Sequence, residues 1–109
     1  MTTPLSVYGF SLDRDALPLA GLLDSEEQRR AAAFVFPHDR DRWTVARATL
    51  RLILAERLQI PPSDVLFATT PSGKPFLRDN HTGLQFNLSH SGGHAAVILA
   101  EGIPVGIDL

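Results

Sequence analysis

Three short motifs in the second half of the chain carry residue types suited to holding a phosphorylated ligand. Gly73-Lys74-Pro75 places the only lysine in a Gly-Pro turn, and Asn87-Leu88-Ser89-His90 ends an apolar run with several hydrogen-bonding groups. Val105-Gly106-Ile107-Asp108 ends another apolar run with a carboxylate. A cation, hydrogen-bond donors and one hard carboxylate are the groups that can hold a phosphate through a divalent ion.

Each motif alone also has a simpler structural interpretation. Gly73-Lys74 is not a P-loop, because Ala68 stands where that motif has its first glycine and Pro75 where it has Ser or Thr. A lone Gly-Lys-Pro is usually a turn. Asp108 at a strand end can likewise be a turn residue, and magnesium usually takes one or two carboxylates together with substrate phosphates.

Ser89 and His90 do not form an obvious nucleophile and base. Adjacent residues of a strand point to opposite faces of its sheet, and the chain contains no Gly-x-Ser-x-Gly elbow. His90 and His94 can converge on a metal only across a turn at Gly92-Gly93, and an ordinary hydrogen-bonded histidine is the commoner case. The sequence therefore indicates binding more clearly than nucleophilic catalysis.

Two helices are expected before these motifs. Asp24 is a suitable N-cap, followed by Glu26 and Glu27 in the first turn of a helix that reaches about Phe34. A longer helix is expected from Pro37 to Leu58, whereas residues 13–21 are expected to be a loop. In the long helix, apolar residues recur at intervals of three and four and predict one core-facing stripe: Trp43, Ala46, Leu50, Ile53, Leu54 and Leu58.

Short segments with a period of two predict the strands. They are residues 5–10, 65–69, 75–77, 84–88, 94–100 and 104–109. Within the run that begins at Leu84, Asn87 and Ser89 share one face. One strand, then helices, then a meander of strands predicts an α+β fold, an antiparallel sheet with helices packed on one face.

Length and composition favour a single domain over residues 1–109, with 44% hydrophobic and 20% charged residues. A net charge of -2 argues against nucleic acid as a partner. No apolar run reaches the ~18 residues of a membrane span. The absence of a signal-like N-terminus and of cysteine makes the cytoplasm the expected location.

Arginine dominates the basic residues of the chain, and six arginines lie between Arg29 and Arg51. Their forked guanidinium groups suit phosphate better than the point charge of a lysine does. Most of the six are nevertheless expected on a solvated helix face.

Taken in order, the three motifs resemble those of the 4'-phosphopantetheinyl transferase superfamily, most closely the two-lobed type that activates peptide, polyketide and fatty-acid carrier proteins. Phe34-x-Phe36 followed by Asp39, Arg42, Arg47 and Leu50-Arg51 is similar to that family's N-terminal helix. The resemblance covers most of the chain from about Glu26 onward.

The resemblance implies a fold, a reaction and a set of site residues. The family transfers the phosphopantetheine arm of coenzyme A onto a serine of an acyl or peptidyl carrier protein, with magnesium at the pyrophosphate. The resemblance implies that Asp108 is a magnesium ligand. It also implies two groups of residues at the nucleotide end of coenzyme A. Lys74 and His90, with Arg30 and Arg42 as further candidates, would contact a phosphate; Gly73, Pro75 and Ser89 would shape the adenine pocket.

The family pattern continues beyond the last residue of this sequence. It has a glutamate two residues after the aspartate and a second lobe with a Trp-x-x-Lys-Glu segment, so we expect the chain to be an N-terminal lobe with low transferase activity alone. No catalytic base is expected within it. The alternative is a non-catalytic lobe that binds coenzyme A, or that pairs with a second lobe or with itself.

Overall fold

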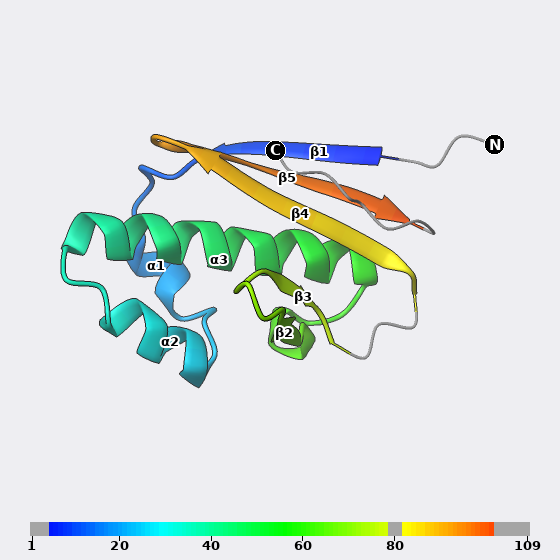
Figure 1. Cartoon of the computed structure of the whole chain (residues 1–109), viewed down its shortest axis with the longest axis horizontal. Coiled ribbons are helices and arrows are strands. Elements are labelled where there is room, and N and C mark those ends of the chain that lie inside the picture. The colour runs from blue at the N-terminus through cyan, green and yellow to red at the C-terminus, as the bar shows by residue number, and fades with distance from the viewer. Residues whose placement is uncertain (1–4, 79–81, 102–109) are drawn as a thin grey trace.

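The sheet and the long helix define the architecture of the computed structural model, which describes residues 5–78 and 82–101. A three-stranded antiparallel sheet has the order β1-β5-β4, and a separate hairpin forms a two-stranded sheet. The helices lie on one side of the larger sheet (Figure 1). The strands are β1 (Leu5–Ser11), β2 (Phe67–Thr69), β3 (Pro75–Leu77), β4 (Leu84–Ser91) and β5 (His94–Glu101); the helices are α1 (Leu17–Ala20), α2 (Ser25–Ala32), α3 (Pro37–Leu58) and the 3-10 turn η1 (Pro62–Asp64).

The central strand β5 pairs along its whole length with β4 and from His94 to Ala100 with β1. Ser11 of β1 and Ser91 of β4 both lie opposite His94, so the β4–β5 hairpin closes tightly at Gly92-Gly93. Gly92 has a φ of 57°, which glycine adopts without the steric cost that other residues meet. This turn fixes the end of β4 that carries His90.

Both principal helices begin at local sequence signals. The Asp24 side chain accepts a hydrogen bond from the Glu27 amide, and the Glu27 side chain accepts one from the Asp24 amide, which completes a capping box at the start of α2. Pro37 opens α3, and the helix ends where Gln59 adopts a left-handed conformation. The predicted bounds of α3 and the predicted N-cap of α2 are confirmed.

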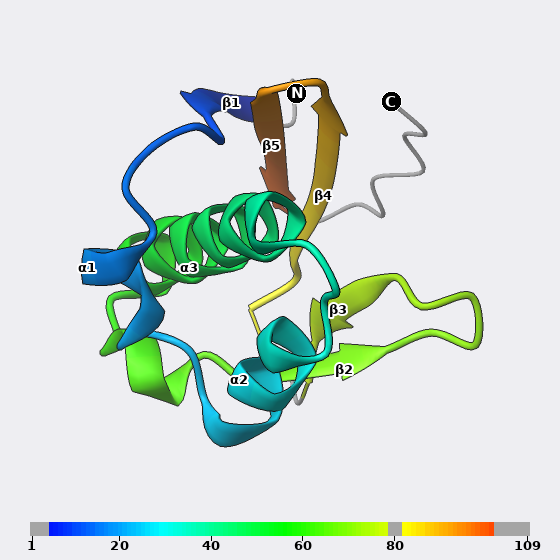
Figure 2. The same cartoon turned by 90° about the vertical axis from the view of Figure 1, so that its left-hand side faces the viewer.

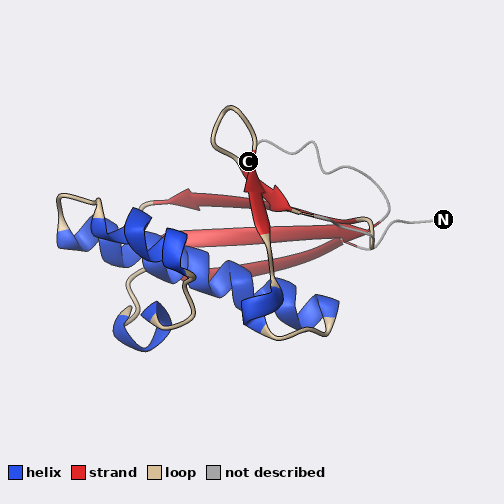
Figure 3. Ribbon diagram, turned by 90° about the horizontal axis from the view of Figure 1, so that it is seen from below, coloured by secondary structure: helices blue, strands red, loops and turns tan. Residues whose placement is uncertain are grey.

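The core lies between α3 and the sheet, and Figure 3 shows α3 lying across the face of the sheet in the view from the helical side. Its largest cluster joins the second half of α3 to β4 and β5: Leu50, Leu54, Ala55, Val65, Leu84, Phe86, Val97 and Leu99. Since these side chains come from segments far apart in sequence, their burial fixes the position of β4 against α3. No helix in the described part of the chain is long and apolar enough to cross a membrane.

The α+β class is confirmed, but several local predictions need correction. The loop expected over residues 13–21 contains the short helix α1. The β2–β3 hairpin does not join the main sheet; it forms its own pair on the helical side, with its loop projecting outward (Figure 2). β2 starts at Phe67, after η1 and two connecting residues, instead of at Val65, and β4 extends to Ser91. The strand expected at 104–109 lies outside the described residues.

Candidate functional site

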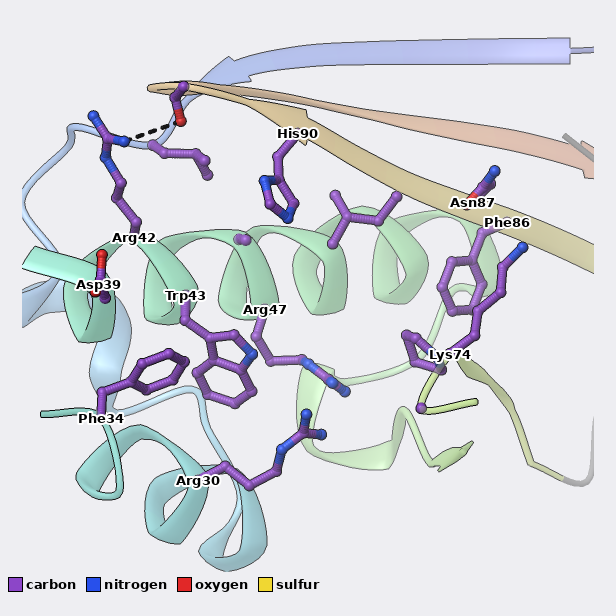
Figure 4. Close-up of a pocket in the computed structure, with 16 residues that line it drawn as sticks. Arg30, Phe34, Asp39, Arg42, Trp43, Arg47, Lys74, Phe86, Asn87 and His90 are labelled. Atoms are coloured by element: carbon purple, nitrogen blue, oxygen red, sulfur yellow. Dashed lines mark hydrogen bonds between the residues drawn. The ribbon is translucent and has the colours of Figure 1, made fainter. Parts of the chain in front are cut away.

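A cavity of about 550 Å³ lies between α2, the first half of α3, the β2–β3 loop and β4 (Figure 4). It brings together six residues that the sequence singled out: Arg30, Arg42, Gly73, Lys74, Pro75 and His90. The rest of its lining includes Phe34, Asp39, Trp43, Arg47, Phe86, Asn87 and Leu88. Residues from four separate elements therefore face one space.

The β2–β3 loop presents Lys74 through a network of short-range hydrogen bonds. The Thr70 amide donates to the Lys74 carbonyl at 2.8 Å, and the Lys74 amide donates to the Thr70 hydroxyl at 3.0 Å. Gly73 has a φ of 92°, a conformation that side-chain-bearing residues rarely adopt. The Gly-Lys-Pro turn is thus a structural turn and also the part of the chain that exposes the lysine at the cavity.

Strand β4 supplies one wall of the cavity. Every second residue of the strand lines the cavity: Phe86, Leu88 and His90. Figure 4 shows the side chains of Phe86 and Asn87 on opposite sides of strand β4. Ser89 shares the face of Asn87, and it is not among the described residues that line the cavity. Its expected part in the adenine pocket stays a prediction.

A cluster of guanidinium groups and aromatic rings forms the opposite wall. The Arg30 and Arg47 guanidinium carbons lie 5.2 and 5.4 Å from the Trp43 ring centroid. The Phe34 ring centroid is 6.0 Å from that of Trp43. Trp43, expected in the core-facing stripe, is partly buried: it packs against the core cluster of Leu23, Ala31 and Ala48 and also lines the cavity. Its i, i+4 spacing from Arg47 is a signal that the periodicity argument overlooked.

Two of the six arginines, both on α3, are buried, whereas Arg29, Arg30 and Arg40 are exposed, as expected for most of the six. Arg51 is 1% exposed; it donates to the Val65 carbonyl at 2.7 Å and forms an ion pair with Glu27. Arg47 is 7% exposed, and its Nη1 lies 3.4 Å from Oε2 of Glu27. Burial lowers the pKa of Arg47, while the carboxylate of Glu27 opposes that change.

Arg42 lines the cavity but is engaged elsewhere. Its Nε donates to Oδ1 of Asp13 at 2.9 Å, and its Nη1 donates to the Gly92 carbonyl at 3.1 Å, the bond that is dashed in Figure 4. The hydrogen bond from Arg42 lowers the pKa of Asp13. Among the described residues, Arg30 and Lys74 have no such carboxylate partner, so they are the cations more available to a ligand.

The cavity can hold an anion beside a flat, apolar group. Arg30, Lys74 and His90 offer donors to a phosphate, while Phe86, Leu88 and Pro75 offer apolar contact. The described residues contain no group of three or more His, Asp or Glu side chains that could hold a metal ion. Asp108, the expected magnesium ligand, lies outside the described residues.

Comparison with known proteins points to one family. A family model described as "4'-phosphopantetheinyl transferase, N-terminal" matches residues 12–102. The chain is 43% identical over 93 residues to the 4'-phosphopantetheinyl transferase HetI of Nostoc sp., covering 84% of this chain and 39% of the relative. It is 32% identical over 94 residues to the L-aminoadipate-semialdehyde dehydrogenase-phosphopantetheinyl transferase of Xenopus laevis, covering 83% of this chain and 31% of the relative.

The human protein of that same name is 32% identical over 91 residues, which cover 80% of this chain and 29% of the relative. The chain therefore spans well under half the length of these relatives. The matched segment nevertheless includes every described element from the end of β1 to the end of β5. The chain belongs to the family of N-terminal domains of 4'-phosphopantetheinyl transferases.

Proposed function

We propose that the cavity binds coenzyme A and that this chain supplies the nucleotide-binding part of a 4'-phosphopantetheinyl transferase. The observation that carries the proposal is the convergence of Arg30, Lys74 and His90 on one cavity, from α2, the β2–β3 loop and β4. Coenzyme A combines several phosphate charges with a planar adenine ring. A ligand of that kind suits a cavity whose lining combines hydrogen-bond donors and cationic side chains with apolar surface.

Each of the three residues has a distinct part in this proposal. Arg30 offers a planar fork that matches the geometry of a phosphate monoester, and its guanidinium is already oriented over the ring of Trp43. Lys74 adds a point charge from a loop whose backbone is fixed by Thr70. His90 adds a ring nitrogen from the end of β4. Together they would hold the 3'-phosphate of coenzyme A.

The remaining lining would receive the adenine ring. Gly73 leaves the loop without a side chain at the rim, and Pro75 and Phe86 present apolar surface beside Lys74. Burying the faces of a planar base against such groups is favourable because it removes apolar surface from water. In this arrangement the nucleotide is anchored and the pantetheine arm is left to reach beyond the cavity.

The proposed reaction is transfer of that arm to a carrier protein. The serine hydroxyl of an acyl or peptidyl carrier protein attacks the β-phosphorus of coenzyme A, a new phosphoester bond forms, and the pyrophosphate bond breaks to release 3',5'-ADP. Magnesium, when bound, supplies neutralisation of the pyrophosphate charge. Asp108 is the residue of this chain that we expect to hold it; because the described residues gather no metal-binding group, we assign no step to the metal.

The proposal is tested by calorimetric titration of coenzyme A into the 109-residue chain, beside a Lys74→Ala/His90→Ala variant. We expect saturable binding by the wild-type chain and its loss in the variant. The matched control is Lys74→Arg, which keeps the charge on the loop and should retain most of the affinity. Absence of binding to the wild-type chain at millimolar coenzyme A contradicts the proposal.

Pairing with a second folded unit is the other candidate function, and one observation favours it. Leu5 and Val7 of β1 are 60% and 66% exposed, and they lie on the opposite face of the strand from Ser6 and Tyr8, which accept hydrogen bonds from Arg57 of α3. Exposed apolar side chains on one face are typical of interaction sites. Sedimentation equilibrium of the wild-type chain and a Leu5→Ser/Val7→Ser variant tests it: strictly monomeric wild-type protein at high concentration rules out self-pairing.

A further inference from the structure

Glu27 is a buried carboxylate that pairs with two arginines and also takes part in the N-terminal cap of α2. It is 4% exposed and lies at the third position of α2, where it completes the capping box with Asp24. It also forms ion pairs with Arg51 and Arg47 of α3. A carboxylate buried this deeply needs such partners, because an unpaired buried charge is costly.

The two oxygens of Glu27 are used unequally. Oε1 accepts a hydrogen bond from the Asp24 amide at 2.9 Å and another from Arg51. Oε2 is buried and has no hydrogen-bond partner among the described residues, and it lies 3.4 Å from Nη1 of Arg47. Arg51 is therefore held firmly, whereas Arg47 is held by charge attraction without a hydrogen bond.

Arg47 is oriented by more than Glu27. Its guanidinium lies 5.4 Å from the Trp43 ring centroid and 4.9 Å from that of Phe67, and the side chain lines the cavity. The two rings can keep the guanidinium in place even if the carboxylate loses its charge. Arg47 thus faces a resident anion on one side and the cavity on the other.

We propose that Glu27 is a resident counter-ion that competes with the ligand's phosphate for Arg47, and so limits how strongly the cavity prefers a ligand with an additional phosphate monoester. This inference rests on the proposed function, since it takes coenzyme A as the ligand. With Glu27 ionised, part of the charge of Arg47 is already compensated before the ligand binds. Without that charge, Arg47 is a buried cation that a ligand phosphate can compensate.

If Glu27 competes for Arg47, removal of its charge should raise the affinity for coenzyme A instead of lowering it. Glu27→Gln keeps an oxygen that can accept from the Asp24 amide and from Arg51, but it removes the negative charge beside Arg47. We expect the variant to be less stable yet to bind coenzyme A more tightly, because the ligand phosphate then gains the full attraction of Arg47. A residue that only maintained the fold would, when changed, weaken binding of every ligand.

The experiment compares the dissociation constants of coenzyme A and of dephospho-coenzyme A, which lacks the 3'-phosphate, by calorimetry on the 109-residue chain. The ratio of the two constants measures the preference for that phosphate. In Glu27→Gln we expect the preference to rise about tenfold, the size of a typical coupling between two sites. The matched control is Asp24→Asn, because Asp24 pairs with Arg51 but is 56% exposed and has no ion pair with Arg47.

The outcomes separate this inference from the proposed function. A raised preference in Glu27→Gln, with Asp24→Asn close to wild type, supports the competition. An unchanged or reduced preference in folded Glu27→Gln overturns it while leaving coenzyme A binding intact. If Glu27→Gln does not fold, the same ratio of dissociation constants is measured for Glu27→Asp, whose shorter side chain keeps the charge but withdraws it from Arg47. A raised preference in Glu27→Asp supports the competition, and an unchanged or reduced preference overturns it. A wild-type chain that binds neither ligand contradicts the proposed function and this inference with it.

Discussion

Arg42 and Asp13 join the start of α3 to the segment after β1 through two hydrogen bonds, at 2.9 and 3.2 Å. The same guanidinium also binds the Gly92 carbonyl, so it ties together three segments that meet at one end of the cavity. Arg42, which the family resemblance implies as a candidate phosphate contact, therefore also holds the scaffold together at this end of the cavity.

This arrangement predicts that Arg42→Ala and Lys74→Ala have different effects. Arg42→Ala should lower the urea midpoint of unfolding and change coenzyme A affinity only modestly, because its donors already have partners within the chain. Lys74→Ala should leave the midpoint near that of wild type and weaken binding about tenfold or more, the loss expected for a charge-assisted hydrogen bond. Calorimetry and urea unfolding on both variants check the contrast; stronger loss of affinity in Arg42→Ala would contradict it.

The same ion pair predicts a pH dependence of stability. Because the folded state lowers the pKa of Asp13, its ionised form contributes stability above the ordinary aspartate pKa, and that contribution is lost as the pH falls through the lowered value. Asp13→Asn should therefore be less stable than wild type at neutral pH. The difference should shrink below about pH 4, where aspartates take up protons. Urea unfolding of both proteins across this range measures it.

The ion pair between Arg42 and Asp13 forms in the space that a side chain at residue 93 would occupy, and Gly93 has none. A Cβ added at Gly93 would lie 2.3 Å from Oδ2 of Asp13 and 3.2 Å from Nη2 of Arg42. Since the clash is with the end of a flexible side chain, Gly93→Ala should fold but displace Asp13 from Arg42. The pKa of Asp13, followed by carboxyl NMR titration, is expected to rise toward its ordinary value. Gly9→Ala is the control, because a Cβ there meets nothing within 4 Å.

Among the ion-paired arginines of α3, Arg51 is predicted to contribute most to the free energy of unfolding. Arg51→Met removes the bonds to the Pro62 and Val65 carbonyls and leaves Glu27 buried with a weaker partner. The expected loss is about 3–5 kcal/mol of unfolding free energy, as for other broken buried pairs. Arg57→Met, which breaks a pair at 3.4 Å with the half-exposed Glu101, should cost about 1 kcal/mol. Equal losses in the two variants would show that burial of the pair does not matter.

The sequence was informative where a local signal determines the structure. Asp24 and Glu27 formed the expected cap, Pro37 and Leu58 bounded the long helix, and the Gly-Lys-Pro segment formed a turn at the cavity. These features depend on a few neighbouring residues. The α+β class followed from the same kind of evidence, since the periods of the helix and of the strands are both local.

The arginines show where local reasoning failed. Arg47 and Arg51 look like exposed helix residues in sequence, but Glu27 lies 20 and 24 positions before them and becomes their partner only when α2 packs against α3. The ion pair of Arg42 with Asp13 likewise spans 29 positions. Trp43 fitted the apolar stripe, yet its neighbours Arg30 and Arg47 place it at the cavity. Such long-range pairing has no signature in periodicity.

The measurement that tests the central claim most directly is an NMR titration of the isotope-labelled 109-residue chain with coenzyme A, recording every assigned backbone amide. We predict saturable shift changes at the β2–β3 loop around Lys74, at His90 near the end of β4 and around Arg30 in α2. The exposed sheet face at Leu5 and Val7 should remain unchanged. Shifts confined to that face, or none at millimolar coenzyme A, would contradict a nucleotide site in this cavity.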